Sequence, residues 1–348
     1  MNNRLLKDLG ENRIVARFRA LASGSLTPDV IVGPGDDAAV LAADADRLLL
    51  LACDMMVEGV HFRRHWARPW QLGWKAMAQN ISDIAAMGGR PFAAVASIAA
   101  PGDLPEEAAA GIAEGLVAAS SRYGASLVGG DLVGSTGPVV IDVAITGWVP
   151  RDRLLLRRGA RPGDALLVTG QLGAAAAGLA ALQHGLPQAE SPLLAEALRA
   201  HHEPQPRLEE AQAIAAARLA TAMMDLSDGL ADDLPRLCQQ SGVGARINAA
   251  AIPIAPASSF VAHSLGLSDL RLALSGGEDY QLLLTCPPQA VQALAAAVAQ
   301  AGSPLTVIGE IIREEEVTML DAEGRAHPLG RGFDHFKARQ KEKGKRQK

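Results

Sequence analysis

The stretch TAMMDLSDGL (residues 221–230) decides the fold class, because an apolar run ends there in a group of acids and a glycine that lead into a helix. Residues 221–224 have the composition of a buried strand, and residues 230–241 have that of a helix. Ser227 is a plausible N-cap for this helix, since its hydroxyl can accept a hydrogen bond from an exposed backbone amide. Such a strand-to-helix junction indicates an α/β unit, and it offers free amides to an anion while the acids hold a metal.

Alternating strands and helices continue on both sides of this junction and predict an α/β (α+β) protein of two domains. In the N-terminal half we expect helices at residues 11–22, 69–87 and 106–123, and strands at 29–32, 38–41, 48–53, 92–99, 126–128 and 139–149. In the C-terminal half we expect strands at residues 165–169, 221–224, 282–286 and 305–311, and helices at 174–184, 208–217, 230–241 and 288–301, with irregular chain between 184 and 208. A polar connector at residues 157–164 suggests domains at 1–150 and 151–336, followed by a basic tail at 337–348.

Composition and charge favour a soluble globular enzyme without a nucleic-acid-binding face. The 348 residues are 49% hydrophobic, 20% charged and only 3% aromatic. The tail holds seven Lys or Arg and one Glu, a charge of +6, so the rest of the chain carries −5 − 6 = −11. An acidic body with few aromatics argues against a nucleic-acid partner, and we expect the tail to be a solvated terminus.

Cysteine usage and hydropathy indicate the cellular compartment. Cys53, Cys238 and Cys286 are far apart and lack CxxC spacing, so we expect neither a disulfide framework nor a zinc site. The N-terminus has no apolar signal core, and no apolar stretch is regular and long enough to span a membrane. We therefore expect a cytoplasmic protein with no membrane partner.

Six short acidic motifs, most of them beside glycines, carry the chemistry that the sequence suggests. They are GDD (35–37), CD (53–54), SD (82–83), GGD (129–131), DLSDG (225–229) and GGED (276–279). They stand at the ends of apolar runs, where a chain turns and can approach a ligand. Many carboxylates with few basic neighbours suggest several hard cations, and hard cations suggest phosphate chemistry.

Each motif also has a plainer interpretation, which the sequence leaves open. Asp83 and Asn80 share one helix face and are equally compatible with an exposed polar pair. Gly130 is compatible with an ordinary glycine turn, and His61 with a surface or packing residue. Asp54, at the end of the very apolar run 48–53, is costly to bury unless it is paired or bound to metal.

Two familiar nucleotide-binding motifs are excluded. GPGDDA (33–38) matches GxGxxA loosely, but strand-like sequence follows it where a dinucleotide fold requires a helix. The chain contains no GxxxxGK[ST] motif. A bound nucleotide is then held most simply through metal ions that bridge its phosphates to carboxylates.

Several stretches, in order along nearly the whole chain, match one known family. They are GPGDDAAVL (33–41), CDMMVEGVHF (53–62), KAMAQNISDIAAMGGRP (75–91), LVGGDL (127–132), ARPGD (160–164), DLSDGLADDL (225–234), LSGGEDYQLLLT (274–285) and GFDHF (332–336). Through these stretches the chain resembles the thiamine-monophosphate kinase family of the aminoimidazole ribonucleotide synthetase-like superfamily. GGD and DLSDG alone would indicate only the superfamily. The combination with VEGVHF and GFDHF indicates the thiamine enzyme.

The resemblance implies that the chain phosphorylates thiamine monophosphate with ATP in the last step of thiamine diphosphate biosynthesis. It also implies a homodimer whose N-terminal domains pair to form the active-site clefts, with several Mg²⁺ ions per site. The metal ligands it implies are Asp37, Asp54, Asp83, Asp131, Asp225 and Asp228, and of these Asp54, Asp131 and Asp228 are expected to be essential for catalysis. The implied ATP contacts are Gly130, Asp131, Arg157 and Ser227, and the implied contacts to thiamine monophosphate are His61, Glu278 and Phe333.

One departure concerns the residues before Asp54. The family commonly has hydroxyl residues there, whereas this chain has Ala52 and Cys53. A thiol is a poor magnesium ligand, so either the Cys53 backbone carbonyl serves as the ligand or one metal site is weakened. Other interpretations remain: another ATP-using member of the superfamily, a metal-dependent phosphohydrolase, or a nucleotide sensor without catalysis.

Overall fold

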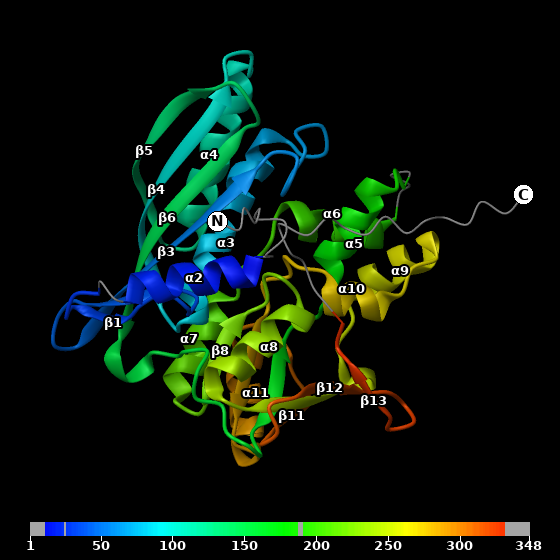
Figure 1. Ribbon diagram of the computed structural model, residues 1–348. Coiled ribbons are helices and arrows are strands. Elements are labelled where there is room, and N and C mark those ends of the chain that lie inside the picture. The colour runs from blue at the N-terminus through cyan, green and yellow to red at the C-terminus, as the bar shows by residue number, and fades with distance from the viewer. Residues whose placement is uncertain (1–10, 24–25, 187–190, 331–348) are drawn as a thin grey trace, which may run out of the picture.

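The computed structural model describes residues 11–23, 26–186 and 191–330, which form two β-sheets flanked by helices (Figure 1). The N-terminal sheet has the strand order β1-β2-β3-β6-β4-β5. Its strands are β1 (Val30–Val32), β2 (Ala39–Ala42), β3 (Arg47–Val57), β4 (Arg90–Pro101), β5 (Ser126–Ser135) and β6 (Val140–Pro150). Neighbouring strands are antiparallel except for the parallel pair β4 and β5.

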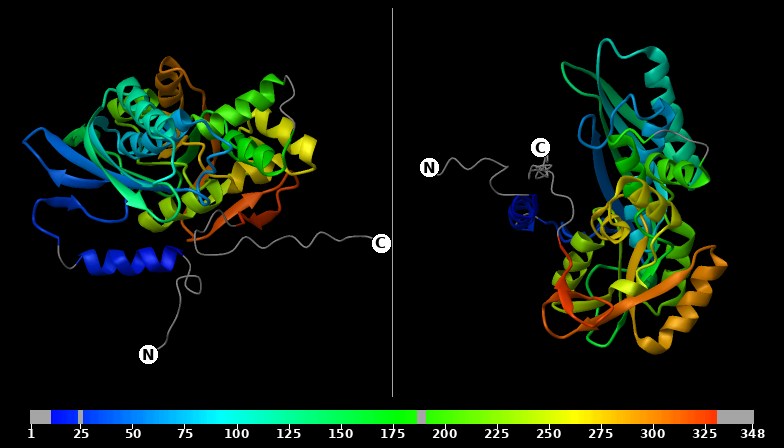
Figure 2. Two further views of the ribbon diagram at one scale, coloured as in Figure 1. Left: turned by 90° about the horizontal axis from the view of Figure 1, so that it is seen from above. Right: turned by 90° about the vertical axis from the view of Figure 1, so that its right-hand side faces the viewer.

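Helices cover one face of the N-terminal sheet and leave the other face open. Helices α3 (Pro69–Ala86) and α4 (Glu106–Arg122) lie on the covered face (Figure 1). Along β3, Leu48, Leu50 and Ala52 are buried, whereas Leu51 and Met55 on the opposite face are 41% and 51% exposed. Helix α2 (Glu11–Ser23) lies on the outside of the molecule in both views of Figure 2.

The C-terminal sheet has the strand order β13-β12-β9-β11-β7-β10-β8. Its strands are β7 (Ala165–Thr169), β8 (Ala222–Asp225), β9 (Gly244–Asn248), β10 (Leu282–Cys286), β11 (Leu305–Ile312), β12 (Val317–Leu320) and β13 (Ala326–Pro328). Strands β7, β8 and β10 are buried along their whole length, because helices pack on both faces of the sheet.

The C-terminal half contains three clusters of buried apolar side chains: one on each face of the sheet, and a smaller one, called the satellite, among three further helices. Helices α8 (Leu230–Ser241) and α10 (Asp269–Ser275) pack on one face, and α7 (Leu208–Ala217) and α11 (Val291–Gln300) on the other. The satellite consists of α5 (Ala174–Gln183), α6 (Pro192–His202) and α9 (Pro256–Leu265). Short 3₁₀ turns occupy Arg151–Arg153, Ala249–Ala251 and Pro288–Ala290. In the part of the chain that the structure describes, no helix has the length and apolar character needed to cross a membrane.

Helix α3 joins the two halves of the molecule. It packs against β3, β6 and α4 on one side and against α6, α7 and β8 on the other. A Cβ atom at Gly73 would lie 1.9 Å from the Ile112 carbonyl oxygen, so glycine is what lets α3 and α4 approach so closely. Because α3 is buried on almost every side, its polar side chains must find partners inside the protein.

Most of the expected elements are confirmed, but several details at the candidate site were wrong. Strand β3 continues to Val57, so Asp54 lies inside the strand and not at its end. Strand β5 runs through Gly130, where we expected a turn; a Cβ atom there would lie 1.9 Å from the Ala96 carbonyl oxygen, so glycine serves close strand packing. Asn80 is fully buried, which excludes the exposed-pair interpretation.

Other errors lie in the C-terminal half. The N-cap of α8 is Gly229, and Ser227 makes no capping hydrogen bond. Residues 185–207 are not all irregular, since α6 begins there at Pro192, behind a Ser191 side chain that accepts a hydrogen bond from the Leu194 amide. The elements β9, α9, α10, β12 and β13 were not expected.

Candidate active site

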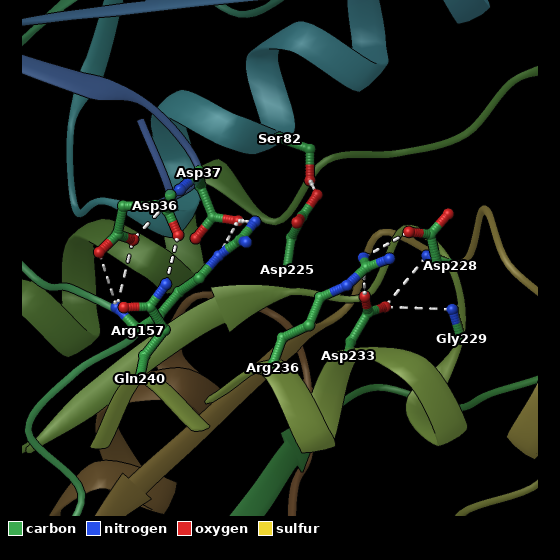
Figure 3. Close-up of polar contacts among 11 residues, drawn as sticks. Asp36, Asp37, Ser82, Arg157, Asp225, Asp228, Gly229, Asp233, Arg236 and Gln240 are labelled. Atoms are coloured by element: carbon green, nitrogen blue, oxygen red, sulfur yellow. Dashed lines mark hydrogen bonds and ion pairs between the residues drawn. The ribbon is translucent and has the colours of Figure 1, made fainter. Parts of the chain in front are cut away.

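Three aspartates from three separate segments meet where α3 crosses the end of β8. Asp37 comes from the loop before β2, Asp83 from α3, and Asp225 from the last position of β8. Each offers one carboxylate oxygen, and these oxygens lie within 4.8 Å of one another. We call these three residues the aspartate cluster. Figure 3 shows two members of the cluster, Asp37 and Asp225, with Ser82 above Asp225.

The aspartate cluster has the chemical character of a magnesium site. Two of its buried oxygens, Asp37 Oδ2 and Asp225 Oδ1, have no hydrogen-bond partner among the described residues. The other Asp225 oxygen accepts a hydrogen bond of 2.5 Å from Ser82 Oγ. A buried carboxylate oxygen without a partner is unfavourable, and a hard cation with oxygen ligands at about 2.1 Å would satisfy it. These residues therefore fit Mg²⁺.

Crowding and burial also raise the pKa values of the acids at this site. Burial and the nearby Asp37 carboxylate raise the pKa of Asp225 to about 7. Burial and then Asp54 raise the pKa of Asp83 well above its ordinary value. Asp54 is exposed at the surface of the single chain, yet desolvation followed by the charge of Asp228 raises its pKa to about 6. The ionised set is therefore repulsive until a cation balances it.

Arg157 holds the first side of the site. Its guanidinium group pairs with the buried Asp37 carboxylate, and its Nε donates to Asp37 Oδ1 at 3.0 Å. Its backbone N–H donates to both oxygens of Asp36 at 3.2 Å (Figure 3). Gln240 adds a hydrogen bond of 2.9 Å to the Gly35 carbonyl oxygen. The GDD loop is thus fixed to the C-terminal half through the chain at residue 157 and through α8.

Arg236 holds the opposite side. Its guanidinium group pairs with Asp228 and lies 3.0 Å from Asp233 (Figure 3). The buried Asp233 carboxylate accepts hydrogen bonds from the backbone amides of Asp228 and Gly229 at 3.0 and 3.1 Å. Asp233, and not Ser227, is therefore the residue that satisfies the amides at the start of α8.

Comparison with known proteins now identifies the family. The models for the AIR synthase related protein N-terminal and C-terminal domains match residues 35–149 and 161–321. The thiamine-monophosphate kinase of Escherichia coli strain K12 is 38% identical over 329 residues, covering 94% of this chain and 98% of that protein. That of Synechococcus elongatus is 36% identical and covers 97% of this chain and 99% of that protein. The chain belongs to the thiamine-monophosphate kinase family.

Solved structures agree with this assignment. A structure of AaThiL complexed with AMPPCP and TMP has a TM-score of 0.83 and 31% identity, covering 96% of this chain and all of that one. The thiamine monophosphate kinase of Aquifex aeolicus has a TM-score of 0.77 and 30% identity, covering 93% of this chain and 99% of that one. Hydrogenase maturation protein HypE, with a TM-score of 0.66 and 18% identity, shares the fold.

Thiamine-monophosphate kinases imply more metal ligands than the three residues of the aspartate cluster. Asp54 and Asp228 lie near the cluster, since the charges of Asp37 and Asp228 both raise the pKa of Asp54. Cys53 differs, since successive strand residues point to opposite faces and its thiol lies on the open face of the sheet. Its backbone carbonyl remains the only part of Cys53 that we predict as a ligand.

Gly130 and Asp131 lie away from the aspartate cluster of the same chain. Asp131 on β5 is paired with Ser97 on β4, which is paired with Asp142 on β6. Asp142 is in turn paired with Met55 on β3, the neighbour of Asp54. Three strand spacings therefore separate Asp131 from this part of β3, a distance of roughly 14 Å. Asp131 is exposed on the open face of the N-terminal sheet, where its carboxylate accepts a hydrogen bond from the amide of Leu132.

Of the three residues that the family resemblance implies as substrate contacts, the structure describes His61 and Glu278. His61 is half-buried, and its Nδ1 accepts a hydrogen bond of 3.0 Å from the Val57 amide, which fixes the ring just beyond β3. Glu278 lies beside the acidic turn, since its amide donates to the Ser227 carbonyl oxygen at 2.8 Å. Phe333 and the tail lie outside the described residues.

Sequence reasoning missed several side chains that organise the site. Arg236 is three residues after Asp233 on α8, a spacing that predicts an ion pair and was overlooked. Ser82 was noted only as the neighbour of Asp83, although it is the hydrogen-bond partner of Asp225. No local signal pointed to Lys75 or His201, which approach Glu278 from distant parts of the chain.

We expect Mg²⁺ to raise the melting temperature of the protein more at pH 8 than at pH 6. The raised pKa values of Asp54 and Asp225 mean that metal-free stability is lost as pH rises from about 4 to about 7. Mg²⁺ binds the ionised carboxylates and recovers this loss, by about 2.7 kcal/mol when its concentration is a hundred times Kd. Thermal melts with and without MgCl₂ measure this, and an equal shift at both pH values would contradict it.

Proposed function

We propose that this chain phosphorylates thiamine monophosphate with ATP, giving thiamine diphosphate and ADP. The family to which the chain belongs carries this reaction, and the buried aspartate cluster with two unsatisfied carboxylate oxygens supports it. The AaThiL structure complexed with AMPPCP and TMP, similar to 96% of this chain, supports the same pair of ligands. Three free cysteines in the described residues suit a cytoplasmic enzyme.

The transfer proceeds directly, with a phosphate oxygen of thiamine monophosphate attacking the γ-phosphorus of ATP. That oxygen is ionised near neutral pH, so the attack requires no strong general base. Bond formation to the acceptor oxygen accompanies loss of the bond to the β–γ bridging oxygen, which leaves with ADP. The principal obstacle is repulsion between two anionic reactants.

The protein's part in this reaction is to hold positive charge between the two phosphate groups. Asp37, Asp83 and Asp225, together with Asp54 and Asp228, would bind several Mg²⁺ ions that neutralise and align the phosphates. Arg157 and Ser227 contact ATP. His61, Glu278 and Phe333 bind the thiamine phosphate.

The active enzyme is a homodimer in which Gly130 and Asp131 complete the partner's site. Within one chain, three strand spacings separate Asp131 from the part of β3 that carries Asp54, which is too far for the two carboxylates to share an ion. The open face that carries it also exposes large apolar side chains, and contiguous exposed apolar surface is typical of an interface. These side chains are Leu51, Met55, Phe92, Val95 and Val128.

One assay tests the proposed function. Purified protein is incubated with ATP, MgCl₂ and thiamine monophosphate, and thiamine diphosphate and ADP are measured by chromatography. We expect the two products in equal amounts. Phosphate release without thiamine diphosphate would favour a phosphohydrolase, binding without turnover would favour a sensor, and a trapped phosphoprotein would contradict direct transfer.

A further inference from the structure

A second group of polar side chains, formed by Lys75, His201 and Glu278, lies beside the acidic turn. Lys75 Nζ lies 2.7 Å from each oxygen of Glu278, and His201 Nδ1 lies 3.1 Å from Glu278 Oε2. The side chains of Lys75 and His201 are only 3% and 4% exposed, whereas that of Glu278 is 24% exposed. The two partners therefore cover the inner side of the carboxylate and leave one side open.

The loop that carries Glu278 is held in an unfavourable backbone conformation. Glu278 and Tyr280 have φ values of 70° and 47°, a region that residues with a Cβ atom rarely adopt. The amide of Glu278 donates to the Ser227 carbonyl oxygen at 2.8 Å, and that of Tyr280 donates to the Leu226 carbonyl oxygen at 2.9 Å. These bonds fix the position of the Glu278 carboxylate relative to the acidic turn that contains Asp228.

The surroundings of Lys75 and His201 mix apolar and polar side chains. A small hollow beside these two residues is lined by Phe62, Trp66 and Leu72, and also by Arg63 and Gln71. Burial lowers the pKa of His201, and burial followed by the charge of His201 lowers the pKa of His202 to about 3. Both imidazoles are therefore neutral at neutral pH, and the charges of Lys75 and Glu278 balance.

We propose that Lys75 and His201 are positioning residues, which hold the Glu278 carboxylate ready to accept a hydrogen bond from the organic end of thiamine monophosphate. This proposal rests on the proposed function. The thiamine moiety offers an aminopyrimidine N–H donor and a positively charged thiazolium ring, and an ionised carboxylate favours both. Because Lys75 belongs to α3 of the N-terminal half and His201 to α6, binding of the substrate's organic end depends on contact between the two halves.

Electrostatics gives this arrangement a measurable signature. Burial raises the pKa of Glu278, but Lys75 and then His201 outweigh it and keep the pKa well below its usual range. The titratable groups that act on or respond to Glu278 are Lys75, His201, His202, Asp279 and Tyr280. Without Lys75 the effect of burial is opposed only by His201, so the pKa of Glu278 rises and its carboxylate is protonated more readily as pH falls.

The test compares Lys75→Met with the unmodified protein in steady-state kinetics. We expect KM for thiamine monophosphate to rise about ten-fold near pH 8, and KM for ATP to stay within about two-fold. The ratio of KM in the variant to KM in the unmodified protein should grow as pH falls to 6. Taking this ratio cancels the effect of the substrate's own titration, which is the same for both proteins. Lys75→Arg should restore part of the affinity. Arg199→Met, which removes an exposed cation from the same helix as His201, is the control and should change neither constant.

A double substitution separates positioning from a purely structural role. If Lys75 acts through Glu278, then Lys75→Met should add less than about two-fold to the KM effect of Glu278→Gln. Additive effects, or an unchanged KM in an active Lys75→Met protein, would overturn the proposal. If the Lys75→Met protein does not fold, KM for thiamine monophosphate is measured for His201→Asn instead, with and without Glu278→Gln. His201→Asn should then add less than about two-fold to the KM effect of Glu278→Gln. If the unmodified protein forms no thiamine diphosphate, the proposed function fails first and this proposal falls with it.

Discussion

Replacing Asp225 by Asn is expected to lower the rate of thiamine diphosphate formation by at least about a thousand-fold while the protein remains folded. Asp225 supplies one of the three oxygens of the aspartate cluster, and an amide cannot provide the negative charge that Mg²⁺ requires. The fold should tolerate the change, because Asn has the same shape and its carbonyl oxygen can still accept the hydrogen bond from Ser82. Loss of one repulsive charge next to Asp37 and Asp83 also favours the metal-free fold.

Asp164→Asn provides the matched control for this substitution. Asp164 is also buried, at 5% exposure, and accepts hydrogen bonds from the Arg161 amide at 2.9 Å and from Thr221 Oγ1 at 2.6 Å. It lies outside the site, so its replacement should lower the free energy of unfolding by about 1 kcal/mol and leave kcat nearly unchanged. Initial rates and urea unfolding measure both effects. More than about a tenth of normal activity in the Asp225→Asn protein would exclude Asp225 as an essential metal ligand.

The local elements of this protein follow from its sequence because local patterns determine them. Helix α4 and strand β7 lie within one residue of their expected ends, since apolar periodicity and terminating glycine or proline act over a few residues. Strand β5 was misjudged because glycines normally disfavour strands, and only the approach of β4 explains why Gly130 occurs within one.

The candidate site depends on contacts that no local pattern contains. Ser82 and Asp225 are separated by 143 residues, and Lys75 and Glu278 by 203. The acidic motifs could be recognised one by one, and family resemblance could predict their roles. The position of α3 against β8 determines which of these acids lie close enough together to bind one ion. This position follows from packing of the whole chain. The buried Lys75 resembled an ordinary helix lysine in the sequence for the same reason.

Mixing two inactive variants, Asp225→Asn and Asp131→Asn, is expected to restore about a quarter of the normal activity. In a two-fold dimer, a site that takes Asp225 from one chain and Asp131 from the other is intact once in every heterodimer. Random assembly makes half of the dimers heterodimers, and each of these has one intact site of two. If Asp131 served the site of its own chain, every site would carry one substitution and the mixture would stay inactive.

A second mixture controls for nonspecific rescue. Asp54 and Asp225 lie in one site of one chain, where the charge of Asp54 acts on Asp225, so mixing Asp54→Asn with Asp225→Asn should restore nothing. Co-expression with two different affinity tags yields the heterodimer of each pair, which in the first pair should have about half of the normal activity. Analytical ultracentrifugation confirms its mass. Recovery in the first pair alone would mean that the open face of the N-terminal sheet both joins the subunits and supplies Asp131 to the partner. Recovery in neither pair would mean that Asp131 serves the site of its own chain, and it would contradict the proposed sharing of residues between subunits.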